Sequence, residues 1–102
     1  MILSPMIEVK KAVSRQASNA KVVLFGSRAR GDSKPDSDWD VLILVDKERI
    51  TAKDFEEINY PIFEIGFQIG EYISPKLYTF KEWEARKFTP FYKNVEQEGI
   101  VI

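Results

Sequence analysis

Two aspartates are the residues of this sequence whose type and spacing most clearly favour chemistry. Asp38 and Asp40 stand two apart at the start of the apolar run WDVLILV, and in an extended strand that spacing turns both carboxylates to one face. Their mutual repulsion is costly unless a cation lies between them. Mg²⁺ is the natural cation, because it is held by one or two carboxylates together with substrate phosphates. We therefore predict that Asp38 and Asp40 bind metal and act in catalysis.

A Gly-Ser pair about ten residues earlier predicts an anion site. Gly26 and Ser27 end the apolar run 21–25 and precede a short polar stretch that favours a helical turn. Such a turn exposes backbone N–H groups to an anion, and glycine lets the backbone approach a phosphate closely. The Ser27 hydroxyl can donate to a phosphate oxygen, while Arg28 and Arg30 add positive charge. All four residues are predicted to bind nucleotide.

Neither motif is specific alone. A Gly-Ser turn is most often an ordinary tight turn, and a lone Asp-x-Asp is most often a solvated loop edge. Their order carries the prediction: a buried strand, Gly-Ser, a basic turn, a polar loop, and then Ser-Asp-x-Asp leading into an apolar strand.

The elements that must position these residues alternate between helices and strands along one domain, 1–102, without repeats or linkers. Apolar spacing, capping residues and turn residues predict them. They are a helix from Ser4 and Pro5 to about Asn19, strands at 21–25 and 39–45, short helices at 27–30 and 51–58, a third strand at roughly 62–73, a helix opened by Thr79 and Glu82 and running to about Lys87, a helix from Thr89 and Pro90 to Gly99, and a tail at 100–102 that either adds an edge strand or packs on a partner.

The third strand is predicted from alternation. Phe63, Ile65, Phe67 and Ile69 recur every second residue after Pro61, which is the period of a half-buried strand. The intervening residues, including Glu64 and Gln68, would share the other, small and polar face.

Composition narrows the function classes. The 102 residues include no histidine and no cysteine and carry a formal net charge of −1. Histidine-based catalysis, thiolate zinc sites and disulfides are thereby excluded, which leaves oxygen ligands for any metal. Mixed surface charges give no nucleic-acid footprint. The N-terminus does not resemble a signal peptide, and no run of about 20 apolar residues could span a membrane; the expectation is a cytoplasmic protein.

The stretch GSRARG followed by SDWDVLILV resembles the minimal nucleotidyltransferase domain of the DNA polymerase β-like superfamily, of the MntA-like antitoxin type. The resemblance implies an α/β (α+β) fold, a small mixed sheet with helices packed on one face and the triphosphate and Mg²⁺ on the other. It implies transfer of a nucleoside monophosphate, AMP from ATP, to a hydroxyl. In that family the acceptor is in some members a tyrosine of a small helical HEPN-type partner, so an antitoxin role is implied.

The match is incomplete at one position. Active members of the family carry a third carboxylate on the next strand, which binds metal and can serve as a base. On the predicted third strand this position falls on Gln68, whose amide cannot accept a proton usefully. Glu64 on the same face is an alternative, and Glu71 is another if a bulge near Gly70 re-aims it. The alternative function is therefore a catalytically degenerate module that binds nucleotide or a partner.

Aromatic residues raise one further question. Trp39, between the two aspartates, is expected in the core because it faces the opposite side of its strand. Six more aromatic residues crowd the last third of the chain, and they either pack two short helices on the sheet or form an exposed patch for a partner or for a homo-oligomer. They are Tyr72, Tyr78, Trp83, Phe88, Phe91 and Tyr92.

Overall fold

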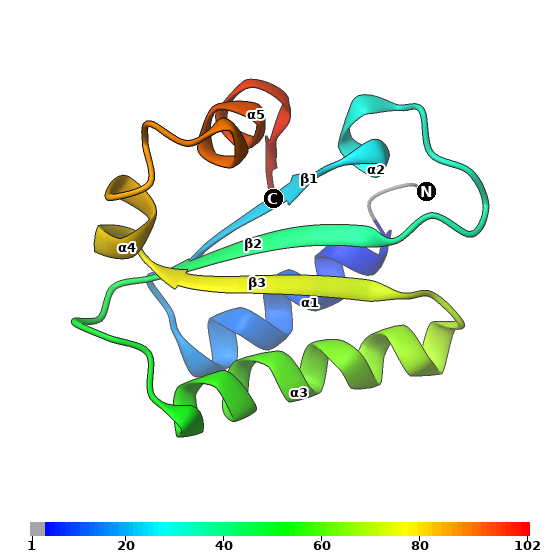
Figure 1. Cartoon of the computed structure of the whole chain (residues 1–102). Coiled ribbons are helices and arrows are strands. Elements are labelled where there is room, and N and C mark those ends of the chain that lie inside the picture. The colour runs from blue at the N-terminus through cyan, green and yellow to red at the C-terminus, as the bar shows by residue number, and fades with distance from the viewer. Residues whose placement is uncertain (1–3) are drawn as a thin grey trace.

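The computed structural model describes residues 4–102. Helices cover both faces of a four-stranded mixed sheet (Figure 1). In chain order the elements are α1 (Ser4–Gln16), β1 (Lys21–Phe25), α2 (Ser27–Arg30), β2 (Trp39–Val45), α3 (Ala52–Ile69), β3 (Ile73–Thr79), α4 (Phe80–Glu84), α5 (Pro90–Glu98) and β4 (Ile100–Val101). The predicted α/β class is confirmed. The described part of the chain leaves out residues 1–3 and the side chain of Ser4, so the predicted cap at Ser4 lies outside it.

The sheet has the strand order β3-β2-β1-β4. β1 runs antiparallel to β2, with Phe25 opposite Asp40, while β3 runs parallel to β2, with Ser74 opposite Asp40. The tail forms the edge strand, because Leu24 pairs with Ile100 and the N–H of Ile102 donates to the Val22 carbonyl at 2.9 Å. The end of β1 and the start of β2 therefore meet at one end of the sheet, which brings the two predicted motifs together.

The two longer helices bury one face of the sheet. α1 contributes Met6, Val9 and Val13, and α3 contributes Ile58 and Ile62, all of them buried. They pack on the odd-numbered residues of β2, including Trp39, which is 4% exposed. The prediction that Trp39 belongs to the core is confirmed. Figure 1 shows α1 and α3 side by side beneath the sheet.

The predicted third strand was wrong. Residues 62–69 belong to α3, which starts at the predicted cap Thr51 and continues through Pro61 to Ile69. The alternating residues 63, 65, 67 and 69 overlap a second pattern, Ile58, Ile62, Ile65 and Ile69, whose spacing is helical. Ile58 and Ile62 are buried against α1 and the sheet and Ile65 is partly buried there, and this packing decided the outcome, at the cost of the backbone hydrogen bond that Pro61 cannot donate.

Local signals fix both ends of α3. Thr51 and Asp54 form a capping box, and Lys47 donates to the Asp54 carboxylate. These contacts, that of Lys47 foremost, lower the pKa of Asp54 to about 2. At the other end Gly70 adopts φ +72°, a left-handed conformation that ends helices. The strand that follows α3 is β3, about ten residues later than predicted.

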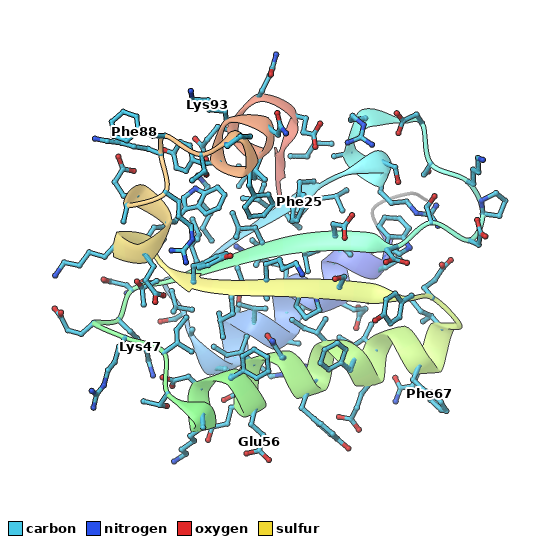
Figure 2. All side chains as sticks on the ribbon, viewed as in Figure 1. Phe25, Lys47, Glu56, Phe67, Phe88 and Lys93 are labelled. Atoms are coloured by element: carbon cyan, nitrogen blue, oxygen red, sulfur yellow. The ribbon has the colours of Figure 1, made fainter. Side chains whose placement is uncertain are left out.

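The opposite face of the sheet is partly covered by α4 and α5. Thr79 with Glu82 forms the predicted capping box of α4, and Thr89 caps α5 as predicted. Trp83 belongs there to a buried cluster with Phe25, Leu42 and Leu44. Three of the other aromatic residues, which are partly buried, pack against this cluster: Tyr78, Phe91 and Tyr92. Figure 2 shows Phe25 between β1 and α5. Four of the six aromatic residues therefore pack the C-terminal helices, whereas Phe88 and Tyr72 are 80% and 64% exposed.

No helix within residues 4–102 is both long and apolar enough to cross a bilayer.

Candidate nucleotide and metal site

The Gly-Ser turn and the second aspartate are in direct contact. Gly26 follows β1 with φ +76°, and a Cβ built on it would lie 2.5 Å from Oδ2 of Asp40. The carboxylate therefore occupies the space that any larger residue at position 26 would need. Asp40 therefore lies directly beside the Gly-Ser turn.

Asp38 and Asp40 form an electrostatically coupled pair. Asp40 is half-buried at the start of β2, and Asp38 is exposed just before it. Burial raises the pKa of Asp40, and the charge of Asp38 raises it further. Lys76 and Arg30 act in the opposite direction without cancelling the shift. A divalent cation would stabilise the charged form of Asp40, which burial and the neighbouring charge disfavour.

The donor set suits Mg²⁺. Within residues 4–102 there is no group of three acidic, histidine or cysteine side chains that could hold a metal ion. Two hard carboxylates that leave the remaining positions to phosphate oxygens and water match the usual coordination of Mg²⁺ in nucleotide enzymes. Asp38 and Asp40 would hold the ion, and a triphosphate would complete its ligands.

Ser27 begins α2 immediately beyond Gly26. The Gly26 carbonyl accepts from the N–H groups of Ala29 and Arg30, both at 3.0 Å, and Gly31 ends the helix with φ +84°. This single tight turn holds Ser27 half-buried next to the glycine that Asp40 touches. Ser27 is thus brought to the same end of the sheet as the carboxylate pair.

Arg30 is already engaged by carboxylates. Its guanidinium donates to Asp32 and to both oxygens of Glu98 at 3.2–3.3 Å, and these contacts raise its pKa. Glu98 also accepts from the Gly26 N–H at 3.2 Å. Glu98 thereby links the end of α5 to the Gly-Ser turn.

Glu98 is a site residue that the sequence did not reveal, since it lies 72 residues beyond Gly26. The register of β4 on β1 explains its position: Leu24 pairs with Ile100, so Glu98 comes opposite Gly26. Gly99 makes this close approach feasible, because a Cβ there would lie 2.6 Å from Cγ1 of Val23 and 2.5 Å from the Val95 carbonyl oxygen. The only signal in the sequence was an acidic residue directly before a helix-ending glycine.

Arg28 is buried more deeply than Arg30, with its side chain 12% exposed. Its Nη2 donates to the Ser37 carbonyl at 3.0 Å and to the Pro35 carbonyl at 3.3 Å, and it lies 3.7 Å from Glu71. The guanidinium also stacks over the Trp39 ring at 4.5 Å. These contacts of Arg28 are thus with protein groups in the loop before Asp38, in β2 and in the turn before β3.

The position predicted for a third carboxylate needs correction. Gln68 and Glu64 lie on the exposed side of α3 and not on a strand, so neither is on the face of the sheet that carries Asp40. Parallel pairing instead puts Ser74 opposite Asp40 and Lys76 opposite Leu42. Within β3 this face therefore carries no carboxylate. Glu71, in the turn before β3, is the one of the three candidates that reaches this end of the sheet, where it pairs with Arg28.

A Gly-Ser turn beside two carboxylates at one end of a mixed sheet defines a nucleotidyltransferase-type domain. Over residues 6–102 the chain matches the family model described as nucleotidyltransferase domain, and it belongs to that family. It is also 36% identical over 105 residues to a protein of Methanocaldococcus jannaschii named "Putative protein adenylyltransferase MJ0141". That similarity covers 99% of this chain and 98% of the relative. Membership in a transferase family supports nucleotidyl transfer as the class of reaction.

Proposed function

We propose that this protein is a Mg²⁺-dependent adenylyltransferase that transfers AMP from ATP to a hydroxyl group on another protein. The contact between Asp40 and Gly26 carries the proposal, because it joins a carboxylate suited to a metal with a turn suited to phosphate. The name of the M. jannaschii relative supports adenylate as the transferred group and a protein as the acceptor. The supply of ATP and Mg²⁺ in the cytoplasm suits activity there.

Each site residue has a role in this mechanism. Asp38 and Asp40 hold the metal, and Ser27 with the backbone of the turn orients the triphosphate. Mg²⁺, when bound, supplies neutralisation of the charge that develops on the phosphate oxygens. The acceptor hydroxyl releases its proton to water, its oxygen forms a bond to the α-phosphorus, the bond from that phosphorus to the bridging oxygen breaks, and pyrophosphate leaves. Positioning and electrostatics provide most of the rate gain in such reactions.

The acceptor follows from the resemblance of GSRARG and SDWDVLILV to the minimal nucleotidyltransferases. We propose a tyrosine of a small helical HEPN-type partner, with this chain acting as the antitoxin. The neighbouring gene is where such a partner would be encoded.

The test of this function uses the purified chain, ATP labelled in the α-phosphate, Mg²⁺ and the product of the neighbouring gene. We expect label on the partner and Mg²⁺-dependent thermal stabilisation by ATP. At 100 times the dissociation constant the stabilisation should be about 2.7 kcal/mol. Label that persists in the double variant Asp38→Asn, Asp40→Asn would refute the assignment of the site.

A second candidate, a degenerate binding module, is favoured by the absence of a carboxylate on the site face of β3. It predicts Mg²⁺-dependent ATP binding without transfer to any acceptor. In the enzyme of the first candidate, no β3 carboxylate receives the proton of the acceptor hydroxyl.

Ser74→Asp separates the two candidates. A carboxylate opposite Asp40 would add a base, and general-base catalysis contributes on the order of 10²–10⁴-fold, so we expect the transfer rate to rise at least about 10-fold. Ser74→Asn is the matched control, because asparagine is similar in size to aspartate but carries no charge. This variant should leave the rate unchanged. If Ser74→Asp binds ATP yet gains no rate, the missing carboxylate is not what limits transfer.

A further inference from the structure

Arg28 connects three segments that the sequence keeps apart. Its guanidinium reaches Pro35 and Ser37 in the loop after α2, the Trp39 ring at the start of β2, and Glu71 in the turn before β3. A side chain that is 12% exposed and meets carbonyl, aromatic and carboxylate partners together is held in one place.

The loop contacts bracket Asp38. Ser37 precedes it and is held through its carbonyl, while Trp39 follows it and is held through its ring. Trp39 is fixed further by its backbone N–H, which donates to the Tyr72 carbonyl at 2.9 Å. Asp38 itself is exposed, so packing of its own side chain does not hold it, and its location depends on the backbone at its two neighbours.

The same contacts compete with a role in phosphate binding. A phosphate on Arg28 would have to replace the Ser37 carbonyl or Glu71 at the guanidinium. Desolvating a charge and then removing its partners is costly. Arg28 therefore stabilises the site more through its present contacts than it would by binding a phosphate.

We propose that Arg28, held by Glu71, is a positioning residue that sets the location of Asp38 and does not bind the triphosphate. The inference rests on the proposed function for the role of Asp38 as a metal ligand. Its structural part, that Arg28 orders residues 35–39, stands apart from that function.

The decisive variant is Arg28→Lys, which keeps the charge but loses the planar stacking and the paired carbonyl bonds. We expect the Mg²⁺ concentration for half-maximal ATP binding to rise about 10-fold, within the range for loss of outer partners of metal ligands, while binding of ATP without Mg²⁺ stays unchanged. Glu71→Gln should move the same value in the same direction by a smaller factor.

Arg86→Lys is the matched control. Arg86 also stacks over an aromatic ring, Tyr78 at 4.5 Å, and donates to a backbone carbonyl, that of Glu82 at 2.9 Å, but it lies after α4 and is separate from Asp38 in these contacts. The Mg²⁺ requirement should be unchanged in this variant. If Arg28→Lys weakens ATP binding equally with and without Mg²⁺, Arg28 is a phosphate ligand and the proposal is overturned.

Amide hydrogen exchange distinguishes failure of this inference from failure of the proposed function. In Arg28→Lys without nucleotide, the amides of Ser37 and Trp39 should exchange at least about 10-fold faster relative to those of β1, because local opening becomes easier. If the unmodified protein shows no Mg²⁺-dependent ATP binding, the proposed function fails. The exchange rates of these two amides then test the structural part of the inference by themselves. Unchanged exchange at both amides would overturn it.

Discussion

Replacing Asp38 or Asp40 with asparagine is expected to reduce nucleotidyl transfer on the order of 10²–10³-fold, the usual cost of removing a group that stabilises charge in a transition state. Asparagine keeps the size and one oxygen but lacks the charge that holds a divalent cation. Mg²⁺-dependent ATP binding should fall in parallel. Labelled transfer and calorimetric titration with and without Mg²⁺ measure the two effects.

Asp40→Asn should not lower the free energy of unfolding. Because burial and Asp38 raise the pKa of Asp40, the folded protein binds this proton more tightly than the unfolded chain does. Stability linked to Asp40 therefore increases as pH falls through the raised pKa, and the charged form is unfavourable at neutral pH. Asp40→Asn should melt at the same or a higher temperature. A lower melting temperature would mean that Asp40 has a structural role instead.

Asp36→Asn is the control for charge in the loop. Asp36 is exposed two residues before Asp38, so its replacement should change neither ATP binding nor transfer. Acidification provides an independent check. Mg²⁺-dependent binding should begin to weaken above the pH at which an ordinary aspartate protonates, because burial and the charge of Asp38 raise the pKa of Asp40.

The second large effect is expected for Gly26→Ala. A Cβ at this position would lie 2.5 Å from Oδ2 and 3.3 Å from Cγ of Asp40, and φ is +76°. The methyl group must therefore displace the carboxylate or the turn, and either movement separates the two halves of the site. We expect at least a roughly 100-fold loss of transfer, as for removal of a charge-stabilising group, together with loss of Mg²⁺-dependent ATP binding.

Gly31→Ala isolates the backbone-strain part of that effect, so the difference between the two variants is the steric part. Gly31 has a similar φ of +84° in the same turn, but among residues 4–102 no atom beyond its chain neighbours and its own helix lies within 4 Å of the position where its Cβ would be. This variant carries only the strain of a left-handed alanine, about 1–2 kcal/mol, and should retain nucleotide binding. Urea unfolding and calorimetry on both variants give the comparison. Equal loss of binding in the two would show that backbone strain, and not contact with Asp40, explains the effect.

Much of the local structure could be predicted because it depends on neighbouring residues. Thr51, Thr79 and Thr89 begin helices through caps that lie within a few residues of each other. The apolar runs of β1 and β2 are short and bounded by turn residues. Both strands have the bounds that the sequence predicts, 21–25 and 39–45. Gly26 lies beside Asp40 because β1 and β2 pair antiparallel, which puts the end of β1 opposite the start of β2.

The error at 62–73 shows the limit of periodicity. Residues 58–69 carry apolar side chains that satisfy both a period of two and a helical period, and Pro61 favoured the wrong choice. Phe63 and Phe67, the basis of the strand prediction, are 47% and 90% exposed, and Figure 2 shows Phe67 projecting from α3 away from the sheet. Only packing against α1 and the sheet selects the helix, and the misplaced Gln68 and Glu64 follow from this one error.

The sequence by itself determined which residues can do chemistry here, since a carboxylate pair at a strand start and a glycine after a strand are properties of residue type and spacing. Tertiary structure alone decided what surrounds them. Arg28 and Arg30 have long side chains that can reach many partners, and their partners Glu71 and Glu98 come from distant segments. Pairing of β4 with β1 and of β3 with β2 brings these segments to the site, and such pairing depends on the burial of whole faces, which no local pattern specifies.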